Sequence, residues 1–412
     1  MSTHAPHPHA WLTPSLGLTQ IVGWGSMFYA YGVLMQPMQD ELGLSKPAVV
    51  GAYSVALLIS GLLSTSAGSI IDRVGGRALM AGGSLLAALM LLCLSRVHSV
   101  VGLYLAWAGI GVAMSATLYQ PAFAVITQIF GNDYRRAITH LTLFGGFAST
   151  VFWPLTQTLL QHVGWRDAWL LYAVANLAIC VPVHIALPRR SLAPHNATPI
   201  PTQTEQSTAN LGTVLRDPAF YLVTAAVTLN ALVFAAMSLH MIPVLQAHGI
   251  SAANAAWVGA LVGPMQVLGR VLETTIGKRA STRQVGMAAI TLLPLSLVLL
   301  FASGKWLPVY VVFAALYGIG NGVMTIVRGA LPAELYGRTA YGAISGAMAT
   351  PVQIAIAAGP FVASLLYVAG NGYPGTLLAL AGIGATGAIL FRYAILHLRH
   401  HAVPLSKQGI ST

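Results

Sequence analysis

The sequence contains very few charged residues. Asp, Glu, Lys and Arg make up only 7% of its 412 residues, whereas soluble globular proteins use about 25%. Such a chain cannot form a water-exposed surface over its whole length, which excludes an ordinary soluble protein. A mean hydropathy of +0.73 and 42 glycines instead favour a protein surrounded by lipid, in which small residues let helices approach closely.

Cysteine is also scarce. Cys93 and Cys180 both lie in apolar runs, so they are expected to be small buried residues that form no disulfide framework. The N-terminal segment contains His4, His7 and His9, for which a metal-binding tail and a disordered tail are both open, the latter being favoured. No cofactor and no metal site are predicted.

Several catalytic and targeting motifs are absent. There is no G-x-x-x-x-G-K-[ST] segment, so the chain is not expected to hydrolyse ATP. An intramembrane enzyme that uses His140 or His240 would need convergent nucleophiles, bases or metal ligands, and no such spacing occurs. An enzyme is therefore not predicted. The polar segment from Thr3 to His9 does not resemble a cleavable signal, so the first apolar run is expected to direct membrane insertion.

Long apolar runs dominate the rest of the chain. Each is close to the ~20 residues that a helix needs to cross a bilayer. The twelve runs cover residues 16–36, 48–70, 78–95, 100–129, 138–161, 168–187, 219–245, 254–276, 285–303, 308–332, 341–369 and 374–396. They predict an all-α integral membrane protein with twelve transmembrane helices.

The runs divide into two sets of six. A segment rich in Pro, Ser, Thr and Gln separates them and is typical of a flexible linker. The predicted parts are a cytoplasmic tail over 1–15, a six-helix bundle over 16–187, a cytoplasmic linker over 188–218, a second bundle over 219–396 and a cytoplasmic tail over 397–412.

The basic residues indicate an orientation. With the N-terminus inside, fourteen Lys and Arg residues fall on the cytoplasmic side and four outside, as the positive-inside rule requires. The cytoplasmic ones are Arg73, Arg77, Arg135, Arg136, Arg189, Arg190, Arg216, Lys278, Arg279, Arg283, Arg338, Arg392, Arg399 and Lys407, and the outer ones are Lys46, Arg96, Arg166 and Lys305. We expect a multi-pass protein of the cell (inner) membrane with both termini in the cytoplasm. Because these charges are scattered over short loops, the net charge of +11 does not indicate a nucleic-acid partner.

The two halves share weak internal similarity. GIGVAM from Gly109 resembles GIGNGVM from Gly318, and PLTQTLLQHVG from Pro154 resembles PFVASLLYVAG from Pro360. The offsets of 209 and 206 residues nearly agree. A duplicated six-helix unit predicts two pseudo-symmetric bundles with a binding site between them.

The loop after the second apolar run contains a family motif. It reads GSIIDRVGGR and resembles the G-x-x-x-D-R-x-G-R signature between helices 2 and 3 of major facilitator transporters, with a degenerate copy, GRVLE followed by GKR, at the matching loop of the second half. The resemblance implies the major facilitator fold, an acidic residue that caps a neighbouring helix, and arginines that pair across a cytoplasmic gate. The gate residues that it indicates are Gly68, Asp72, Arg73, Gly76, Arg77 and Glu273.

The first half is most similar to the monocarboxylate and oxalate/formate transporter branch. The similar segments are YGVLMQPMQDELGLSK, the gate loop, GIGVAMSATLYQPAF, RRA and GWRDAW, within residues 31–175. In that branch, an arginine on helix 8 lies four residues after an aspartate and binds the substrate carboxylate. The corresponding pair here is Gln266 and Arg270, so the arginine is kept and the aspartate is not. The branch's helix 11 lysine is also missing, and Gln353 is the most polar residue near its place.

Two arginines lie within apolar runs. Arg270 is about seven residues, or ~10 Å, before Gly277. A guanidinium inside a membrane is costly, so both Arg270 and Arg328 are predicted to bind substrate. The alternative for Arg270 is a structural pair with Glu273. For Arg328 it is a structural tie to Glu334 or to backbone carbonyl oxygens at the cytoplasmic end. No acidic residue lies in the middle of any run, so the two arginines together favour a carboxylate ligand.

Other polar residues within the runs are weaker candidates. Tyr119, Gln120, Asn230 and Gln353 are predicted to line the substrate site, with polar packing contacts between helices as the alternative. His140 and His240 are candidates for proton coupling because imidazole titrates near neutral pH, with packing histidines as the alternative.

The sequence therefore predicts a secondary active transporter of a small organic anion, a monocarboxylate or dicarboxylate, that works by alternating access. Its expected partners are this anion, the lipid bilayer, and a coupling proton or counter-anion. The competing hypothesis is a major facilitator exporter of an amphiphilic or toxic compound. That hypothesis predicts binding that survives loss of Arg270.

Overall fold

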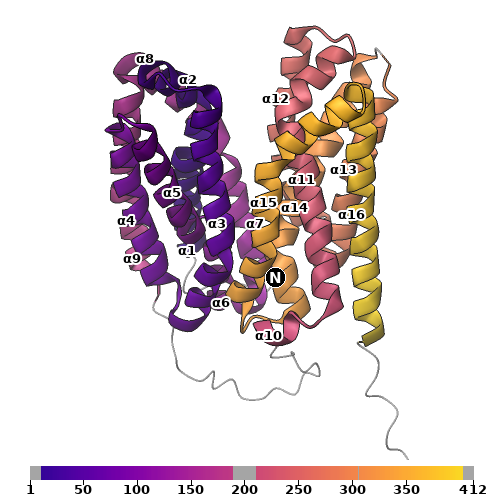
Figure 1. The fold of residues 1–412 in the computed structure, drawn as a ribbon. Coiled ribbons are helices and arrows are strands. Elements are labelled where there is room, and N and C mark those ends of the chain that lie inside the picture. Colours follow the sequence, from indigo (N-terminus) through magenta and orange to yellow (C-terminus); the bar gives the residue numbers. More distant parts are fainter. Residues whose placement is uncertain (1–10, 189–209, 305, 402–412) are drawn as a thin grey trace, which may run out of the picture.

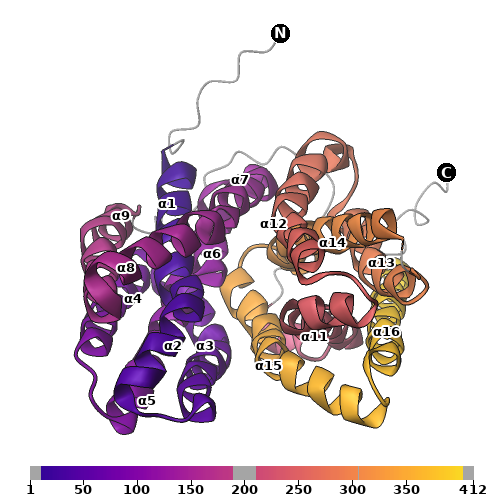
Figure 2. The ribbon, with the colours of Figure 1, turned by 90° about the horizontal axis from the view of Figure 1, so that it is seen from above.

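The computed structural model describes residues 11–188, 210–304 and 306–401, and within these ranges every regular element is a helix. Two bundles stand side by side (Figures 1 and 2). The first contains α1 (Leu12–Trp24), the π-helix η1 (Gly25–Tyr29), α2 (Ala30–Leu42), α3 (Lys46–Val74), α4 (Gly76–Ser95), α5 (Val100–Thr117), α6 (Tyr119–Ile129), η2 (Gly131–Asp133), α7 (Tyr134–Gly146), α8 (Ala148–Ala175), the π-helix η3 (Asn176–Cys180) and α9 (Val181–Ala186).

The second bundle follows the short helix α10 (Leu211–Val214), which lies within the predicted linker. It contains α11 (Pro218–Ala247), α12 (Ala252–Thr275), η4 (Gly277–Arg279), α13 (Thr282–Phe301), α14 (Leu307–Tyr336), α15 (Tyr341–Ala369) and α16 (Tyr373–His401). The last helix thus continues past residue 396, where the apolar run ends. The N-terminal tail before residue 11 and most of the linker lie outside the described residues.

The described helices account for twelve membrane crossings. Nine of them are long and apolar enough to span a membrane, and one of the nine, Tyr134–Ala186, is 53 residues long. This stretch turns back at Gly164, whose φ of 79° favours glycine, and therefore crosses twice. The broken helix formed by α1, η1 and α2 adds one crossing and α12 adds another, which confirms the predicted fold.

Glycines of the repeated GIG segments bring helices together in the same way in both halves. A Cβ atom on Gly111 of α5 would lie 2.4 Å from the Ala56 carbonyl oxygen of α3. One on Gly322 of α14 would lie 2.2 Å from the Gln266 carbonyl oxygen of α12. Each half therefore packs its fourth crossing closely against its second through a residue without a side chain.

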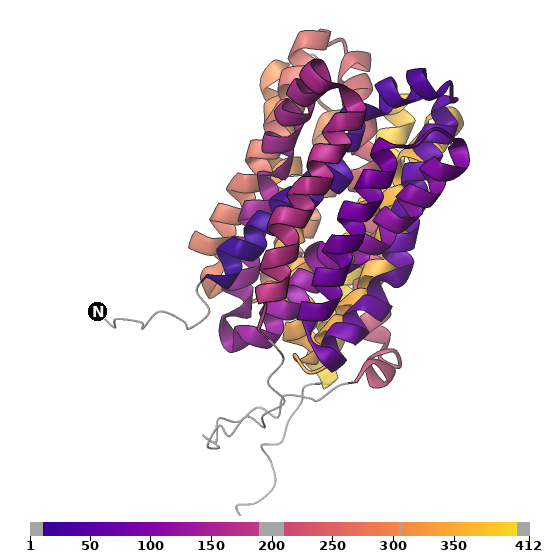
Figure 3. The same ribbon diagram turned by 90° about the vertical axis from the view of Figure 1, so that its left-hand side faces the viewer.

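The two ends of the molecule differ. We call the end at which α9 finishes, α10 lies and α11 begins the linker end, and the other the opposite end (Figures 1 and 3). At the linker end one hydrophobic cluster is shared by both bundles, because Ile326, Ala333 and Tyr341 pack with residues of α1, α6 and α7. Towards the opposite end the ribbons of the two bundles diverge (Figure 1).

Candidate functional site

Arg270 lies on α12, five residues before the helix ends at Thr275, which is about 8 Å inside the linker end. Only 5% of this residue is exposed. Its Nε and Nη1 atoms are buried and have no hydrogen-bond partner in the described part of the chain. The guanidinium lies against α7 of the other bundle, where a Cβ atom added to Gly146 would be 2.1 Å from Nη1. Arg270 therefore places buried donors without acceptors at the contact between the bundles.

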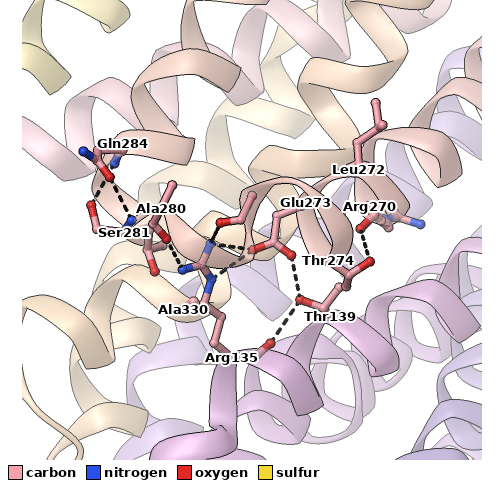
Figure 4. A network of polar contacts seen from close by, with 12 residues as sticks. Arg135, Thr139, Arg270, Leu272, Glu273, Thr274, Ala280, Ser281, Gln284 and Ala330 are labelled. Carbon is pink, nitrogen blue, oxygen red and sulfur yellow. Dashed lines mark hydrogen bonds and ion pairs between the residues drawn. The ribbon is translucent and has the colours of Figure 1, made fainter.

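Glu273 does not pair with Arg270, contrary to the structural alternative. Its carboxylate accepts hydrogen bonds of 2.9 and 2.7 Å from Nε and Nη2 of Arg135, the second residue of α7, and one of 3.2 Å from Thr139. Arg135 also donates to the carbonyl oxygen of Ala280 at 2.7 Å. Figure 4 shows that Arg270 enters this network only through its backbone oxygen and that its guanidinium points away from Glu273.

Arg328 lies on α14, eight residues before Tyr336, and is half-buried. Its Nε donates a long hydrogen bond of 3.4 Å to the Met324 carbonyl oxygen of its own helix. This is a backbone contact of the kind that one structural alternative expects. Glu334, the acidic partner of the other alternative, instead accepts from Arg283 at 3.0 Å and from the backbone of Thr282. Arg328 is close enough to Arg270 for the two charges to repel each other. Neither forms an ion pair within the described residues.

Tyr119 is brought to the two arginines. It begins α6 and interacts electrostatically with both guanidiniums. Its hydroxyl lies against Gly145 of α7, 2.2 Å from where a Cβ atom would be, and Gly145 directly precedes the glycine that contacts Arg270. Its ring stacks on Phe123, with centroids 5.2 Å apart, and the Phe123 ring contacts Gly329, the residue after Arg328. Three residues of two bundles thus converge, and glycines make the approach possible.

The sequence reasoning missed Trp24. Its ring lies 5.1 Å from that of Tyr119, and its buried Nε1 has no hydrogen-bond partner among the described residues. It ends α1 at the π-helical turn η1, a distortion that is frequent at functional sites. The available signal was Trp24 itself, a large aromatic residue that lies between two glycines, one turn before Phe28.

Gln120, Asn230 and Gln353 are not seen to join this group. Gln120 follows Tyr119 and is half-buried, and within the described ranges no contact of its side chain with the arginines is observed. Asn230 is 5% exposed on α11. Gln353 packs on α3, where a Cβ atom on Gly61 would meet its Cβ at 2.7 Å. Their predicted role in binding stays a prediction.

The two histidines also lie elsewhere. His140 is on an exposed face of α7. Nε2 of His240 contacts the Pro360 carbonyl oxygen at 3.2 Å and the Ser364 hydroxyl at 3.4 Å, so this side chain packs between α11 and α15 of one bundle. A coupling role for either residue stays a prediction.

Asp72 joins the bundles at the linker end. Its two carboxylate oxygens accept hydrogen bonds from the backbone N–H groups of Gly342, at 2.9 Å, and Ala343, at 2.7 Å. These are the second and third residues of α15, whose helix dipole favours a negative charge at this end. Gly68 lies one turn earlier on α3, where a Cβ atom would be 1.8 Å from the Gly342 oxygen. The helix cap that the resemblance implies is therefore present.

The other residues of the gate motif behave differently. A Cβ atom on Gly76 would lie 2.1 Å from Val125, so this glycine serves packing within the first bundle. Arg73 is exposed and Arg77 half-buried, and among the described residues neither forms an ion pair with the second bundle. The implied pairing of these arginines across the gate is not seen in this conformation and stays a prediction. Arg135, from the RRA segment, makes the inter-bundle ion pair instead, with Glu273.

Two six-helix bundles that meet around buried cationic donors form the arrangement of a membrane transporter whose site lies between pseudo-symmetric repeats. Comparison with known families also indicates a membrane transporter. The model of the Major Facilitator Superfamily matches residues 16–290, and the chain belongs to this superfamily. It is an integral, multi-pass membrane transporter and not an enzyme.

Several curated proteins are similar in sequence. Monocarboxylate transporter 13 of Rattus norvegicus is 27% identical over 287 residues, which are 69% of this chain and 65% of that protein. Monocarboxylate transporter 4 of the same species is 25% identical over 58% of this chain and 51% of its own length. An MFS-type transporter of Gibberella moniliformis is 25% identical over 84% of this chain and 81% of its own. The chain thus spans less than two thirds of the two monocarboxylate transporters.

Solved structures show the same fold. The human organic anion transporter MFSD10 (TETRAN) superposes with a TM-score of 0.73 at 14% identity, covering 93% of this chain and 99% of that one. A variant of the E. coli fucose:proton symporter FucP gives 0.70 at 17% identity, covering 95% and 99%. At these identities the likeness concerns the fold alone.

Proposed function

We propose that this transporter is a secondary active carrier of a small organic anion, a monocarboxylate or dicarboxylate, that works by alternating access. The observation that carries the proposal is the unpaired state of Arg270, whose Nε and Nη1 are buried without a partner in the described residues. A buried charge without hydrogen bonds is costly. A carboxylate would supply two acceptors to a planar guanidinium and offset this cost.

Arg328 and Tyr119 support the same proposal. Arg328 adds a second positive charge close to the first, and the acidic residues nearest in sequence to the two arginines are bound elsewhere. The Tyr119 hydroxyl adds a neutral donor from the other bundle. A ligand held between these groups would touch both bundles, as a substrate must if its binding is to affect their relative motion. The names of the monocarboxylate transporters agree with an anionic substrate.

We further propose that the linker end faces the cytoplasm of a cell (inner) membrane. The excess of basic residues at this end supports the orientation. The bonds of Asp72 with α15 and of Arg135 with Glu273 would then close the cytoplasmic side, and the described conformation would be outward-facing. Exchange with a counter-anion or coupling to a proton would drive the cycle.

Substitution of Arg270 tests the anion site. We expect Arg270→Gln to weaken the binding of acetate, lactate or succinate to the purified protein roughly 10- to 100-fold, because a hydrogen bond to a charged group contributes about 1.5–3 kcal/mol. Isothermal titration calorimetry in detergent measures this change. The matched control is Arg392→Gln, which removes an exposed arginine from α16. Anion affinity that stays at the wild-type value in Arg270→Gln would reject the proposal and favour the exporter of amphiphilic compounds.

A further inference from the structure

The arginine pair adjoins a band of aromatic side chains that belongs to the other bundle. Tyr119 interacts with both guanidiniums, stacks on Phe123 and lies 5.1 Å from the Trp24 ring. From Trp24 the band continues to Phe28 at 5.3 Å and from there to Tyr53 at 5.9 Å. Charged donors and flat apolar surfaces therefore lie next to each other.

The band leads away from the linker end. α1 begins at this end and proceeds towards the opposite end, so Phe28 lies one turn farther along than Trp24. α3 runs the other way, and Tyr53 lies in its first turns, near the opposite end. Aromatic rings therefore extend from the arginine pair towards the opposite end. This is the end at which the ribbons of the two bundles diverge (Figure 1).

Trp24 has a free donor beside this surface. Its buried Nε1 lacks an acceptor among the described residues, as do two nitrogens of Arg270. A buried indole N–H normally has a partner. A short hydrophilic anion would satisfy the guanidiniums but would not cover the parts of the half-buried Trp24 and Tyr119 that their aromatic neighbours leave exposed. An anion with a flat apolar body would cover both.

We propose that the preferred ligand is an aryl carboxylate, whose carboxylate binds Arg270 and Arg328 and whose ring packs against Trp24 and Tyr119. This inference rests on the proposed function and narrows its substrate class. Aromatic pairs gain binding energy beyond the area that they bury. Trp24 is accordingly a specificity-determining residue that acts on the body of the ligand and not on its charge.

Binding of matched small molecules to the wild-type protein tests the inference without any variant. We expect benzoate to bind about tenfold more tightly than acetate, lactate or succinate, and more tightly than cyclohexanecarboxylate, which has the same charge and a similar size. Benzamide, the uncharged analogue, should not bind measurably. An affinity for acetate, succinate or cyclohexanecarboxylate equal to or above that for benzoate would overturn the proposal.

Variants of Trp24 separate the ring from its N–H group. Trp24→Leu should lower the ratio of benzoate to lactate affinity about tenfold, whereas Trp24→Phe should keep most of this ratio. The control is Trp257→Leu, which removes a tryptophan that is 72% exposed on α12. An unchanged ratio in a folded Trp24→Leu protein, or an equal fall in the control, would refute the role of Trp24.

The two proposals fail in different ways. If Arg270→Gln weakens all carboxylates equally and benzoate has no advantage in the wild type, the aryl preference is wrong and the anion site stands. If benzamide binds as well as benzoate and Arg270→Gln changes neither affinity, the anion site itself is wrong, and with it the inference.

Discussion

The two halves of the molecule make equivalent contacts with different chemistry. In the first half Asp72 of α3 reaches the second residue of α15, Gly342, and binds its backbone N–H. In the second half Glu273 of α12 reaches the second residue of α7, Arg135, and binds its guanidinium. One carboxylate is thus neutralised by a helix dipole and the other by a side chain. The duplicated fold determines where the bundles touch. The residues at each contact determine how much that contact stabilises the closed linker end.

The same contrast applies to the proposed substrate site. At the 209-residue offset of the repeat, Tyr119 of the first half corresponds to Arg328 of the second. The first bundle contributes aromatic rings and a hydroxyl at this level, whereas the second contributes both positive charges. A ligand with a charged end and an apolar body would therefore have a defined direction between two bundles of similar shape.

The largest effect on the closure of the linker end is expected from the ion pair between Glu273 of the second half and Arg135 of the first. Arg135→Gln should weaken the linker-end closure by about 3–5 kcal/mol, because it leaves a buried carboxylate without its partner. A cysteine at Thr350, which bonds to Gly61 across the bundle contact, should then react faster with a water-soluble maleimide. The assay uses a Cys93→Ser background, because Cys93 is exposed; the prediction that both cysteines are buried is wrong for Cys93 and confirmed for Cys180. If the cysteine reacts at the same rate with and without Arg135→Gln, the ion pair does not hold the linker end closed. Arg135→Gln combined with Glu273→Gln should restore most of the protection from labelling.

A smaller effect is expected at the contact between Arg270 of the second half and Gly146 of the first. Gly146→Ala should displace the Arg270 guanidinium, because the new Cβ would lie 2.1 Å from Nη1. We expect about a tenfold loss of carboxylate affinity, measured by calorimetry. Gly263→Ala is the matched control on α12, where a Cβ meets nothing within 4 Å. Equal affinities in the two variants would show that contact with α7 does not position Arg270.

The smallest effect should come from the helix cap that Asp72 of the first half forms on α15 of the second. Asp72→Asn keeps one acceptor oxygen, but its amide nitrogen cannot accept from the other of the two N–H groups, and the negative charge at the start of α15 is lost. Together these losses should cost about 1–2 kcal/mol. The cysteine at Thr350 should become only slightly more reactive than in the parent. If Asp72→Asn raises the labelling rate as much as Arg135→Gln does, the two contacts contribute equally to the closure, and the proposed difference between the halves is wrong.

Much of the fold could be predicted from the sequence. A bilayer demands about 20 apolar residues per crossing, so the twelve spans are visible as runs. The proposed role of Arg270 and Arg328 follows from the cost of a charge in lipid, a local property that needs no knowledge of their neighbours. The cap by Asp72 came from the family motif.

Contacts between residues far apart in the sequence could not be predicted from apolar runs and motifs alone. Arg135 and Glu273 are 138 residues apart. The sequence presents Arg135 as a loop charge and as part of the RRA segment, and neither feature indicates Glu273 as its partner. Gly145 and Gly146 were not singled out, because a glycine reveals its neighbour only once helices are packed. Trp24 was missed because apolar character alone does not tell a ring at a site from one that faces lipid.

The most direct test of the anion site is a cryo-EM structure of the protein with 4-iodobenzoate, whose heavy atom fixes the direction of the ligand. The account predicts carboxylate oxygens within about 3 Å of the Arg270 guanidinium and the iodinated ring towards Trp24. Density for the ligand at a place that neither Arg270 nor Arg328 reaches would contradict it.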